Sequence, residues 1–392
     1  MNWIEKELEL LTNASLERTL RTSAPVSEFP GYTLRGEKVL LNMSSNDYLG
    51  LAQHPAIIEV MREALLTEGV GSGASRLVTG NRSVFVRLEE ALADWQNCEA
   101  ALLFANGYMA NSGVISALVS RDDVVFSDQT NHASIVDGIA LSRAEHARYR
   151  HNDMEHLRKL LIKHQDKRRK LIVTDAVFSM DGDSAPLREL VALKREFGAM
   201  LMVDESHSGG VYGKRGEGLC HELGLQNDVD IHMGTFSKSF GIYGAYICGS
   251  RSLIRWLVNK ARPLIYSTAL PPSIIAGISK ALVLVQNEQW RRERLYTASK
   301  LFRSSLCSAG FHIGVGDSPI VPLIIGDNAM TLRFSSALEA VGIASVAIRP
   351  PTVPEGTARM RFSLSAAHTD QELSDAATKI RAIGLQLGVL SR

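Results

Sequence analysis

Short, almost continuously apolar runs alternate with helix-length amphipathic segments through the middle of the chain. The runs span residues 101–106, 124–128, 170–178, 199–206, 229–237 and 244–250. Strands of a largely parallel sheet have this pattern, because helices cover both faces and neither face meets water. The pattern therefore predicts an α/β fold, in which functional groups lie at the carboxyl ends of the strands.

The hydrophobic patterns at the two ends of the chain differ from the pattern in the middle. One helical pattern and a turn-rich stretch through Pro30–Gly31 make up the first forty residues. Beyond Arg262–Pro263, a helical stretch over residues 272–310 leads to shorter strand patterns between further helices. We predict three parts: an N-terminal segment (1–54), a large α/β domain (55–270) and a smaller α+β C-terminal domain (271–392), which N-terminal residues are expected to join.

Charge and cysteine usage exclude several classes of protein. The 392 residues carry 43 basic and 42 acidic side chains, a net charge of +1, so neither nucleic acid nor an anionic membrane is an expected partner. Four cysteines without CxxC spacing argue against a disulfide framework or a metal site. No apolar run reaches the roughly 18 residues of a membrane span, and the N-terminus lacks a signal-peptide pattern. We expect a cytoplasmic protein.

Two of the predicted strands end in unusual polar groups. The run LMVDESH leads directly into Asp204, with His207 three residues later. The run IHMGTFSK ends in Thr235, Ser237 and Lys238, and glycines follow. A carboxylate at the end of a buried strand is costly unless a cation satisfies it. A lysine among small residues is accessible, and a less polar environment helps it reach the neutral amine that forms imines.

A pyridoxal-phosphate cofactor would account for both strand ends. Its ring nitrogen needs a carboxylate and its aldehyde needs a lysine, which Asp204 and Lys238 would supply. His207 leaves the same strand end as Asp204 and can reach the phenolic oxygen of the ring. Thr235 and Ser237 offer hydroxyls to the phosphate.

A second phosphate contact is expected in FANGYMANSGVISAL (104–118), where backbone N–H groups around Gly107 and Tyr108 open a helix. Each residue also has an ordinary explanation. Asp204 could be a helix N-cap, His207 a buried hydrogen-bonded histidine and Gly107 a turn residue, and a lone T-x-x-K is a weak motif. Their order and their common position at strand ends favour the cofactor.

Longer stretches extend this interpretation over nearly the whole chain. VDESHS (203–208) and GTFSKSFG (234–241) resemble the α-oxoamine synthases, which are fold-type-I pyridoxal-phosphate enzymes. Further similar stretches are SSNDYLGLAQHP (44–55), GSGASRLVTGN (71–81), DQTNHASIVDG (128–138), DAVFSMDGDSAPL (175–187), YSTALPP (266–272) and IRPPTVPEGTARMRFSLSAAH (348–368). The resemblance implies a fold-type-I transferase with a mostly parallel central sheet and a smaller α+β C-terminal domain.

The resemblance also implies roles around the cofactor. Lys238 would form the Schiff base and later move the α-proton of the amino-acid substrate, as a general base close to that carbon can. His132 would stack on the ring, although a helix N-terminal histidine in a polar turn explains it without a ligand. Ser179 would lie near the phenolic oxygen beside His207, and its alternative is a turn serine.

Substrate contacts are implied in other parts of the chain. Arg361 would clamp the amino-acid carboxylate through a bidentate guanidinium. Arg359 and Arg361 alternate with apolar residues, so a solvated polar face is the alternative, and Arg359 fits it. Arg21 and Thr352 are implied at the acyl end, with Arg21 a partner for a far carboxylate. Asn46 is an expected active-site group, and an Asx turn explains it nearly as well.

Residues 71–81, SMDGDSAPL and RPPTVP resemble the members that use L-alanine and a pimeloyl thioester. The implied reaction is a decarboxylative Claisen-type condensation in biotin biosynthesis, with coenzyme A or an acyl carrier protein holding the acyl group. Ser267 and Thr268 in YSTALPP would reach the cofactor phosphate of a neighbouring subunit, which implies a homodimer with active sites at the interface.

Four alternatives remain open at this point. They are a glycine-using oxoamine synthase acting with acetyl-CoA or succinyl-CoA, an aminotransferase, a catalytically silent subunit and a cofactor-binding regulator. Lys238 argues against the silent subunit, and the lack of a basic patch argues against the regulator. An NTPase is disfavoured because no GxxxxGK[ST] loop occurs.

Overall fold

The computed structural model describes residues 2–390, which fall into two compact units. The larger unit contains residues 51–178 and 184–292, and the smaller contains the first fifty residues, residues 179–183 and the chain from Glu293 onward. The outermost residues of the predicted terminal parts, Met1 and residues 391–392, lie outside the described residues.

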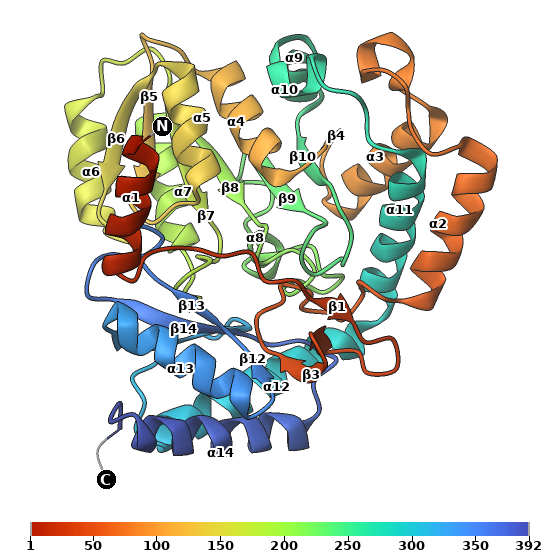
Figure 1. The fold of residues 1–392 in the computed structure, drawn as a ribbon. Coiled ribbons are helices and arrows are strands. Elements are labelled where there is room, and N and C mark those ends of the chain that lie inside the picture. Colours follow the sequence, from red (N-terminus) through yellow and green to blue (C-terminus); the bar gives the residue numbers. More distant parts are fainter. Residues whose placement is uncertain (1, 391–392) are drawn as a thin grey trace. The chain divides into compact units, whose positions relative to one another are not determined.

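Helices and strands alternate along the larger unit (Figure 1). Its elements are α2 (Pro55–Glu68), a π-helical turn (Arg76–Gly80), α3 (Ser83–Trp95), β4 (Ala100–Phe104), α4 (Gly107–Leu118), β5 (Val124–Asp128), α5 (Ala133–Ser142), β6 (Glu145–Tyr149), α6 (Met154–Lys163), β7 (Lys170–Asp175), α7 (Leu187–Phe197), β8 (Met200–Asp204), α8 (Leu219–Glu222), β9 (Ile231–Thr235), β10 (Ala245–Gly249), α9 (Arg251–Lys260), α10 (Arg262–Ile265) and α11 (Pro272–Asn287).

The smaller unit draws its elements from both ends of the chain. They are α1 (Asn2–Asn13), β1 (Ala24–Pro25), β2 (Tyr32–Arg35), β3 (Lys38–Asn42), most of α12 (Gln289–Ser308), β11 (Ile320–Gly326), α13 (Asn328–Ala340), β12 (Ile343–Ala344), β13 (Val346–Ile348), β14 (Ala358–Ser363) and α14 (Asp370–Gln386).

A seven-stranded sheet in the order β4-β10-β9-β8-β7-β5-β6 forms the centre of the larger unit. The strands from β9 to β6 run parallel, and β10 is antiparallel to both of its neighbours. The predicted mostly parallel sheet is therefore confirmed, and each of the six apolar runs coincides largely or wholly with one of its strands. The seventh strand, β6, has the sequence EHARY and escaped prediction because its polar residues mask its strand character.

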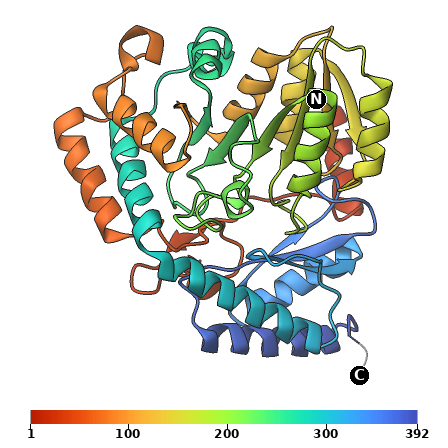
Figure 2. The same ribbon diagram turned by 180° about the vertical axis from the view of Figure 1, so that it is seen from behind.

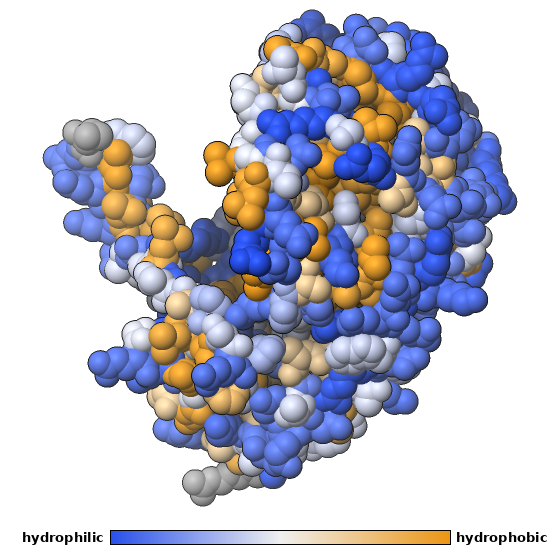
Figure 3. Space-filling view, turned by 90° about the vertical axis from the view of Figure 1, so that its right-hand side faces the viewer, coloured by the Kyte–Doolittle hydropathy of each residue, from blue (hydrophilic) through white to orange (hydrophobic). Residues whose placement is uncertain are grey.

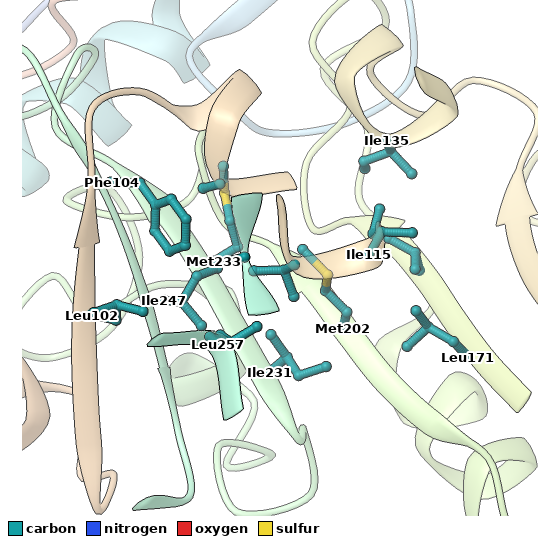
Figure 4. Packing of buried hydrophobic residues seen from close by; sticks show 14 of the residues in the cluster. Leu102, Phe104, Ile115, Ile135, Leu171, Met202, Ile231, Met233, Ile247 and Leu257 are labelled. Carbon is teal, nitrogen blue, oxygen red and sulfur yellow. The ribbon is translucent and has the colours of Figure 1, made fainter. Parts of the chain in front are cut away.

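Helices cover both faces of this sheet. Helices α4 and α5 lie on the face nearer the viewer in Figure 1, and α7 lies on the face nearer the viewer in Figure 2. Side chains of α4, α5 and α9 pack with strand residues in one apolar cluster (Figure 4), which includes Leu102, Ile115, Ile135, Met202, Ile247 and Leu257. Each fully buried side chain of this kind stabilises the fold by roughly 1.5–3 kcal/mol. The strand ends that lead into the site thus rest on a rigid base.

The chain divides between the units after Arg292, beyond the predicted boundary at residues 270/271. Helix α11 buries an apolar face that includes Ile275, Ile278 and Val285, and it packs against α2 and α3 of the larger unit. The single helical stretch predicted over residues 272–310 is two helices, which Glu288 separates.

Two small sheets organise the smaller unit, in the orders β1-β2-β3-β12 and β11-β14-β13. Strand β3 pairs in parallel with β12, with Leu41 opposite Ile343, so the N-terminal residues join the C-terminal part as expected. Helix α14 begins with a capping box, in which Thr369 and Glu372 satisfy each other's backbone N–H groups. Among residues 2–390, no helix is long and apolar enough to cross a membrane.

Candidate active site

Three neighbouring strands of the larger unit end in polar residues at one edge of the sheet (Figure 1). Strands β7, β8 and β9 end at Asp175, Asp204 and Thr235, and these ends open into a cavity of about 340 Å³. Among the residues lining it are eight that the sequence predicted: Gly107, Tyr108, His132, Asp204, His207, Thr235, Ser237 and Lys238. The structure therefore brings the two predicted strand ends and the predicted helix start to one place.

Asp204 is a buried acidic residue, 3% exposed. Its Oδ2 accepts a hydrogen bond from Asn111 Nδ2 at 2.7 Å, and its Oδ1 accepts one from the Ser206 backbone N–H at 2.9 Å. Both donors are neutral, so they orient the carboxylate without cancelling its charge. A protonated ring nitrogen would complete its environment.

His132 caps the start of α5 and faces the same cavity. Its Nδ1 lies 2.8 Å from Ser134 Oγ, and its backbone N–H donates to Asp175 Oδ2 at 2.9 Å. Burial lowers the pKa of His132, and the positive charge of Lys238 acts in the same direction, although Asp204 opposes them. The ring is therefore neutral at neutral pH, as a group stacked on a flat cofactor should be.

The turn after β9 places Lys238 at the cavity. Gly241 closes this turn by donating its N–H to Lys238 O at 2.9 Å. Its backbone has φ +67°, and a Cβ there would lie 2.3 Å from the backbone N of Ala52. Only glycine fits, because both the left-handed conformation and the close approach exclude a side chain.

A buried hydroxyl at the end of β9 is left without a partner. Thr235 is 6% exposed, and its Oγ1 makes no hydrogen bond within the described part of the chain. Such an orphaned group is rare in a folded protein and calls for an explanation. A phosphate oxygen in the cavity would satisfy it.

The N-terminus of α4 faces the same region. Asn106 caps the helix by accepting from Met109 N at 2.9 Å, which leaves the N–H groups of Gly107 and Tyr108 outside the cap. A Cβ on Gly107 would lie 2.6 Å from Thr235 Cγ2, so glycine is required for this close packing. Backbone donors at a helix start favour an anion.

Several lining residues were not predicted: Asn106, Asn111, Ser134, Asp175, Ser206, Met233 and Tyr243. Asp175 had the same signal as Asp204, a carboxylate directly after an apolar run. Asn111 lies one helical turn after Gly107, on the same face of α4. Tyr243 accepts a hydrogen bond from Asn106 Nδ2 at 2.9 Å, a contact between segments far apart in sequence.

A second group of predicted residues meets in the smaller unit around Arg361, which is 7% exposed. Its guanidinium donates to Ser179 O at 2.5 Å, Asn46 Oδ1 at 3.2 Å, Ser363 Oγ at 2.6 Å and Tyr48 OH at 3.4 Å. Arg361 forms no ion pair with any acidic side chain in residues 2–390. A buried cation with only neutral partners favours an anionic ligand.

Arg359 corrects one expectation from the sequence. It is 4% exposed and forms an ion pair with Asp181 at 2.5 Å, so it does not belong to a solvated face. All six residues of β14 are buried, because β11 and β13 flank the strand and other parts of the unit cover both of its faces. The alternation of polar and apolar residues correctly predicted a strand here, but it did not show that both faces of this strand are buried.

Arg21 and Thr352 line a separate cavity of about 400 Å³ in the smaller unit. Arg18, Arg35 and Arg349 line it as well, and burial together with Arg18 and Arg21 lowers the pKa of the Arg349 guanidinium. Arg21 lies 3.0 Å from Glu339, and Arg18, rather than Arg21, donates to Thr352 Oγ1 at 3.3 Å. The structure thus brings the two predicted residues together in a cationic recess.

Ser267 and Thr268 lie outside both cavities. They line a narrow recess of the larger unit with Arg76 and Phe104, and Thr268 forms an isolated β-bridge with Ser75. Their contact with a neighbouring subunit's cofactor stays a prediction, as does the position of Ser179 near a phenolic oxygen.

With this geometry established, the chain can be compared with known proteins. Residues 38–380 match the family model described as aminotransferase class I and II. The chain belongs to this family. Within the family, a curated relative from Geobacillus kaustophilus is 53% identical over 90% of this chain and 91% of its own length, and it is named provisionally as an 8-amino-7-oxononanoate synthase.

Solved structures of family members agree with the fold. A serine palmitoyltransferase variant from S. paucimobilis with a bound PLP–myriocin aldimine has a TM-score of 0.93 and 32% identity, covering 99% of this chain and 98% of its own. An 8-amino-7-oxononanoate synthase from Francisella tularensis has a TM-score of 0.78 and 28% identity, covering 90% of this chain and 99% of its own. The fold class and the resemblance to α-oxoamine synthases are confirmed, and the chain is a PLP-dependent acyltransferase of this group.

The residues of the cavity in the larger unit, at the ends of β7, β8 and β9, fit PLP. The buried Asp204 carboxylate, which has only neutral partners, suits a pyridinium nitrogen, and the orphaned Thr235 hydroxyl with the start of α4 suits a phosphate. Lys238 lines the same cavity and offers the amine that the aldehyde of the cofactor needs.

Proposed function

We propose that the chain catalyses the decarboxylative condensation of L-alanine with a pimeloyl thioester to give 8-amino-7-oxononanoate, CO2 and free thiol, a step in biotin biosynthesis. The observation that carries the proposal is the single cavity in which Asp204, His132, His207 and Lys238 meet. The choice of substrates is supported by the names of the relatives.

In this proposal the chain holds PLP through groups of complementary charge. Lys238 would hold the aldehyde group, Asp204 would hold the ring nitrogen, and His132 would cover the ring. Thr235, Ser237 and the N–H groups that open α4 would hold the phosphate. When bound, PLP supplies an electron sink for the carbanion formed at the substrate's Cα.

Lys238 is assigned the proton transfer, and Arg361 is assigned the positioning of the substrate. The Lys238 amine would take the α-proton of the bound amino acid, and the same amine would return a proton to the substrate after CO2 leaves. Arg361 binds the amino-acid carboxylate, because its buried guanidinium has four neutral partners and no acidic one among the described residues.

The cationic recess of the smaller unit suits the far carboxylate of a dicarboxylic acyl chain. Four arginines line it. Glu17 also lines it, and Glu339 forms ion pairs with Arg21 and Arg35. We assign Arg21 and Thr352 to this end of the substrate. Arg21 would exchange its ion pair with Glu339 for one with the substrate, at small cost, since its side chain is 45% exposed.

We further propose that the enzyme is a homodimer. The face shown in Figure 3, where α2 and α11 lie, carries a band of apolar surface. Large apolar side chains exposed on α2 and the segment after it are Ile58, Leu65, Leu66, Val70, Leu77 and Val78. A contiguous apolar patch of this kind marks an interaction surface. Ser267 and Thr268 would then serve the partner's cofactor.

A substrate panel tests the reaction. Purified enzyme with PLP is assayed for thiol and CO2 release with L-alanine, glycine or L-serine, each with pimeloyl-CoA, acetyl-CoA or succinyl-CoA. We expect turnover only with L-alanine and pimeloyl-CoA. Preference for glycine with a short acyl donor would establish a glycine-using synthase, and conversion of PLP to its amine form by a keto-acid-dependent route would establish an aminotransferase.

The cofactor assignment has its own test. Wild-type protein and Lys238→Ala are mixed with PLP, and visible absorption is recorded before and after borohydride reduction. Lys159→Ala, a change at an exposed lysine of α6, is the matched control. We expect the band and the reducible linkage in wild type and Lys159→Ala but not in Lys238→Ala. An unchanged band in Lys238→Ala would rule out Lys238 as the attachment point.

A further inference from the structure

We propose that Asp175 is a positioning residue of this site, which fixes the segment that carries His132. In this role Asp175 is a neutral carboxylic acid, and Asp204 is the charged carboxylate of the pair. The inference rests on the proposed PLP site. Asp175 does not attach the cofactor, and its role differs from that of the adjacent Asp204.

The register of the sheet brings the two carboxyl groups together. Strands β7 and β8 are parallel neighbours, and Asp175 pairs directly with Asp204. Paired residues on adjacent strands are about 5 Å apart, so their side chains share one environment. Both residues are almost completely buried, at 4% and 3% exposed, and both line the same cavity.

Asp175 ties the segment before α5 to the sheet. Its Oδ2 accepts the His132 backbone N–H at 2.9 Å. Its own backbone N–H donates to Asn131 Oδ1 at 3.1 Å, and Asn131 Nδ2 donates to Val173 O at 2.8 Å. Three hydrogen bonds thus connect the end of β7 to residues 131 and 132, which fixes the backbone from which the His132 ring projects.

The charges around this pair decide where the negative charge lies. Burial is the largest effect that raises the pKa of Asp175, and the charges of Asp204 and Asp128 act in the same direction. The His132 N–H and the charge of Lys238 act to lower this pKa. The raising effects win, so the pKa of Asp175 lies well above its usual range. His132 is neutral and adds no positive charge. Two adjacent buried carboxyl groups cannot both ionise at low cost, and Asp204 is the one that a pyridinium stabilises.

Three variants separate the two parts of this role. Asp175→Asn keeps an oxygen that can accept the His132 N–H and is always neutral, Asp175→Ala removes the acceptor, and Asp204→Asn removes the charge assigned to the ring nitrogen. The readouts are the dissociation constant for PLP and the pKa of the Lys238 Schiff base, taken from its visible band between pH 5 and 10. Circular dichroism checks folding.

For Asp175→Asn we expect PLP affinity within about twofold of wild type, and a Schiff-base pKa within about 0.3 units, because no charge has been removed. For Asp175→Ala we expect PLP affinity to fall by about tenfold or more, because a cavity and an unanchored His132 replace the acid. Asp204→Asn is expected to raise the Schiff-base pKa by about one unit, because the ring nitrogen loses its proton together with its counter-ion, and that proton's positive charge lowers the Schiff-base pKa in wild type.

Two outcomes would overturn the inference. If Asp175→Asn lowers the Schiff-base pKa by about one unit or more, Asp175 is charged in the holoenzyme. If Asp175→Ala binds PLP as wild type does, the residue does not position His132. Failure of the PLP site itself has a different signature, because wild type would then form no band with PLP or Lys238→Ala would keep it.

Discussion

His368 is a buried histidine of the smaller unit, and the protein chain uses both of its ring nitrogens. The Ser365 N–H donates to its Nδ1 at 3.2 Å, so Nε2 carries the proton and donates to Asn42 O at 3.2 Å. Burial lowers the pKa of His368 to about 4. Protonation of Nδ1 would break the Ser365 contact and place a charge in the interior.

This arrangement predicts a loss of stability in mild acid. Between pH 6.5 and 4 the unfolded chain binds a proton at His368 that the folded chain does not, so stability falls as pH falls through this window. From pH 7 to pH 5 the loss is about 2 kcal/mol. Urea unfolding of wild type and His368→Gln at both pH values measures it: the variant is less stable at pH 7 but lacks this share of the pH dependence. His312→Gln, at an exposed histidine, should retain the wild-type dependence.

Single residues were predictable where their signal is local. Asp204 and Lys238 follow apolar runs in the sequence, so their burial and shared edge follow from the strand pattern. Asp175 follows an equally clear run, but its importance lies in its register with Asp204, which the sequence does not state. Arg359 is buried because of Asp181, far away in the sequence, and no local pattern indicates such a pair.

Helix α4 places a helix start against the end of β9. Asn106, Gly107 and Thr235 form this contact, and the helix dipole together with the uncapped N–H groups makes the end of α4 attractive to an anion. The element was predictable from its apolar pattern and its glycine. Its closeness to Thr235 was not, because it depends on how the sheet orders its strands.

Gly107→Ala tests this contact. A Cβ at this position would overlap Thr235 Cγ2 at 2.6 Å and Met233 Cε at 3.0 Å, so helix and strand must move apart. We expect PLP affinity to fall by about tenfold or more, which is about 1.4 kcal/mol. Fluorescence titration with PLP measures the change. Met109→Ala, in the same helical turn but not lining the cavity, should bind PLP as wild type does, and equal losses in both variants would refute the steric explanation.

At the scale of the whole molecule, the sequence predicted the fold class but not how the two units divide the chain. Apolar periodicity indicates a helix at residues 272–287 without stating which unit receives its buried face. The N-terminal residues joined the smaller unit as expected, since β3 finds its partner in β12. Such pairings depend on long-range contacts that a local pattern does not encode.

Assembly is testable at the apolar band of the larger unit. Leu66 is 84% exposed on α2, and a charge there would face the proposed partner subunit. We expect Leu66→Asp to shift the protein toward monomer in sedimentation at micromolar concentration and to lower PLP-dependent activity. Val315→Asp, a change at a residue 80% exposed in the smaller unit, should leave the assembly intact. A dimer unaffected by Leu66→Asp would exclude this face as the interface.

The parallel pairing of β3 with β12 has a consequence for how the protein is made. Leu41 leaves the ribosome first, and its partner Ile343 follows roughly three hundred residues later, which takes about 15–60 s at ordinary elongation rates. During that interval the β2–β3 hairpin has an unpaired edge and an apolar face, a state prone to unwanted pairing with other chains. The larger unit is complete once Arg292 has been added, so it can fold during this wait. Production of the protein should therefore respond to translation speed and to chaperones that shield nascent N-terminal segments, more than to the stability of the finished molecule.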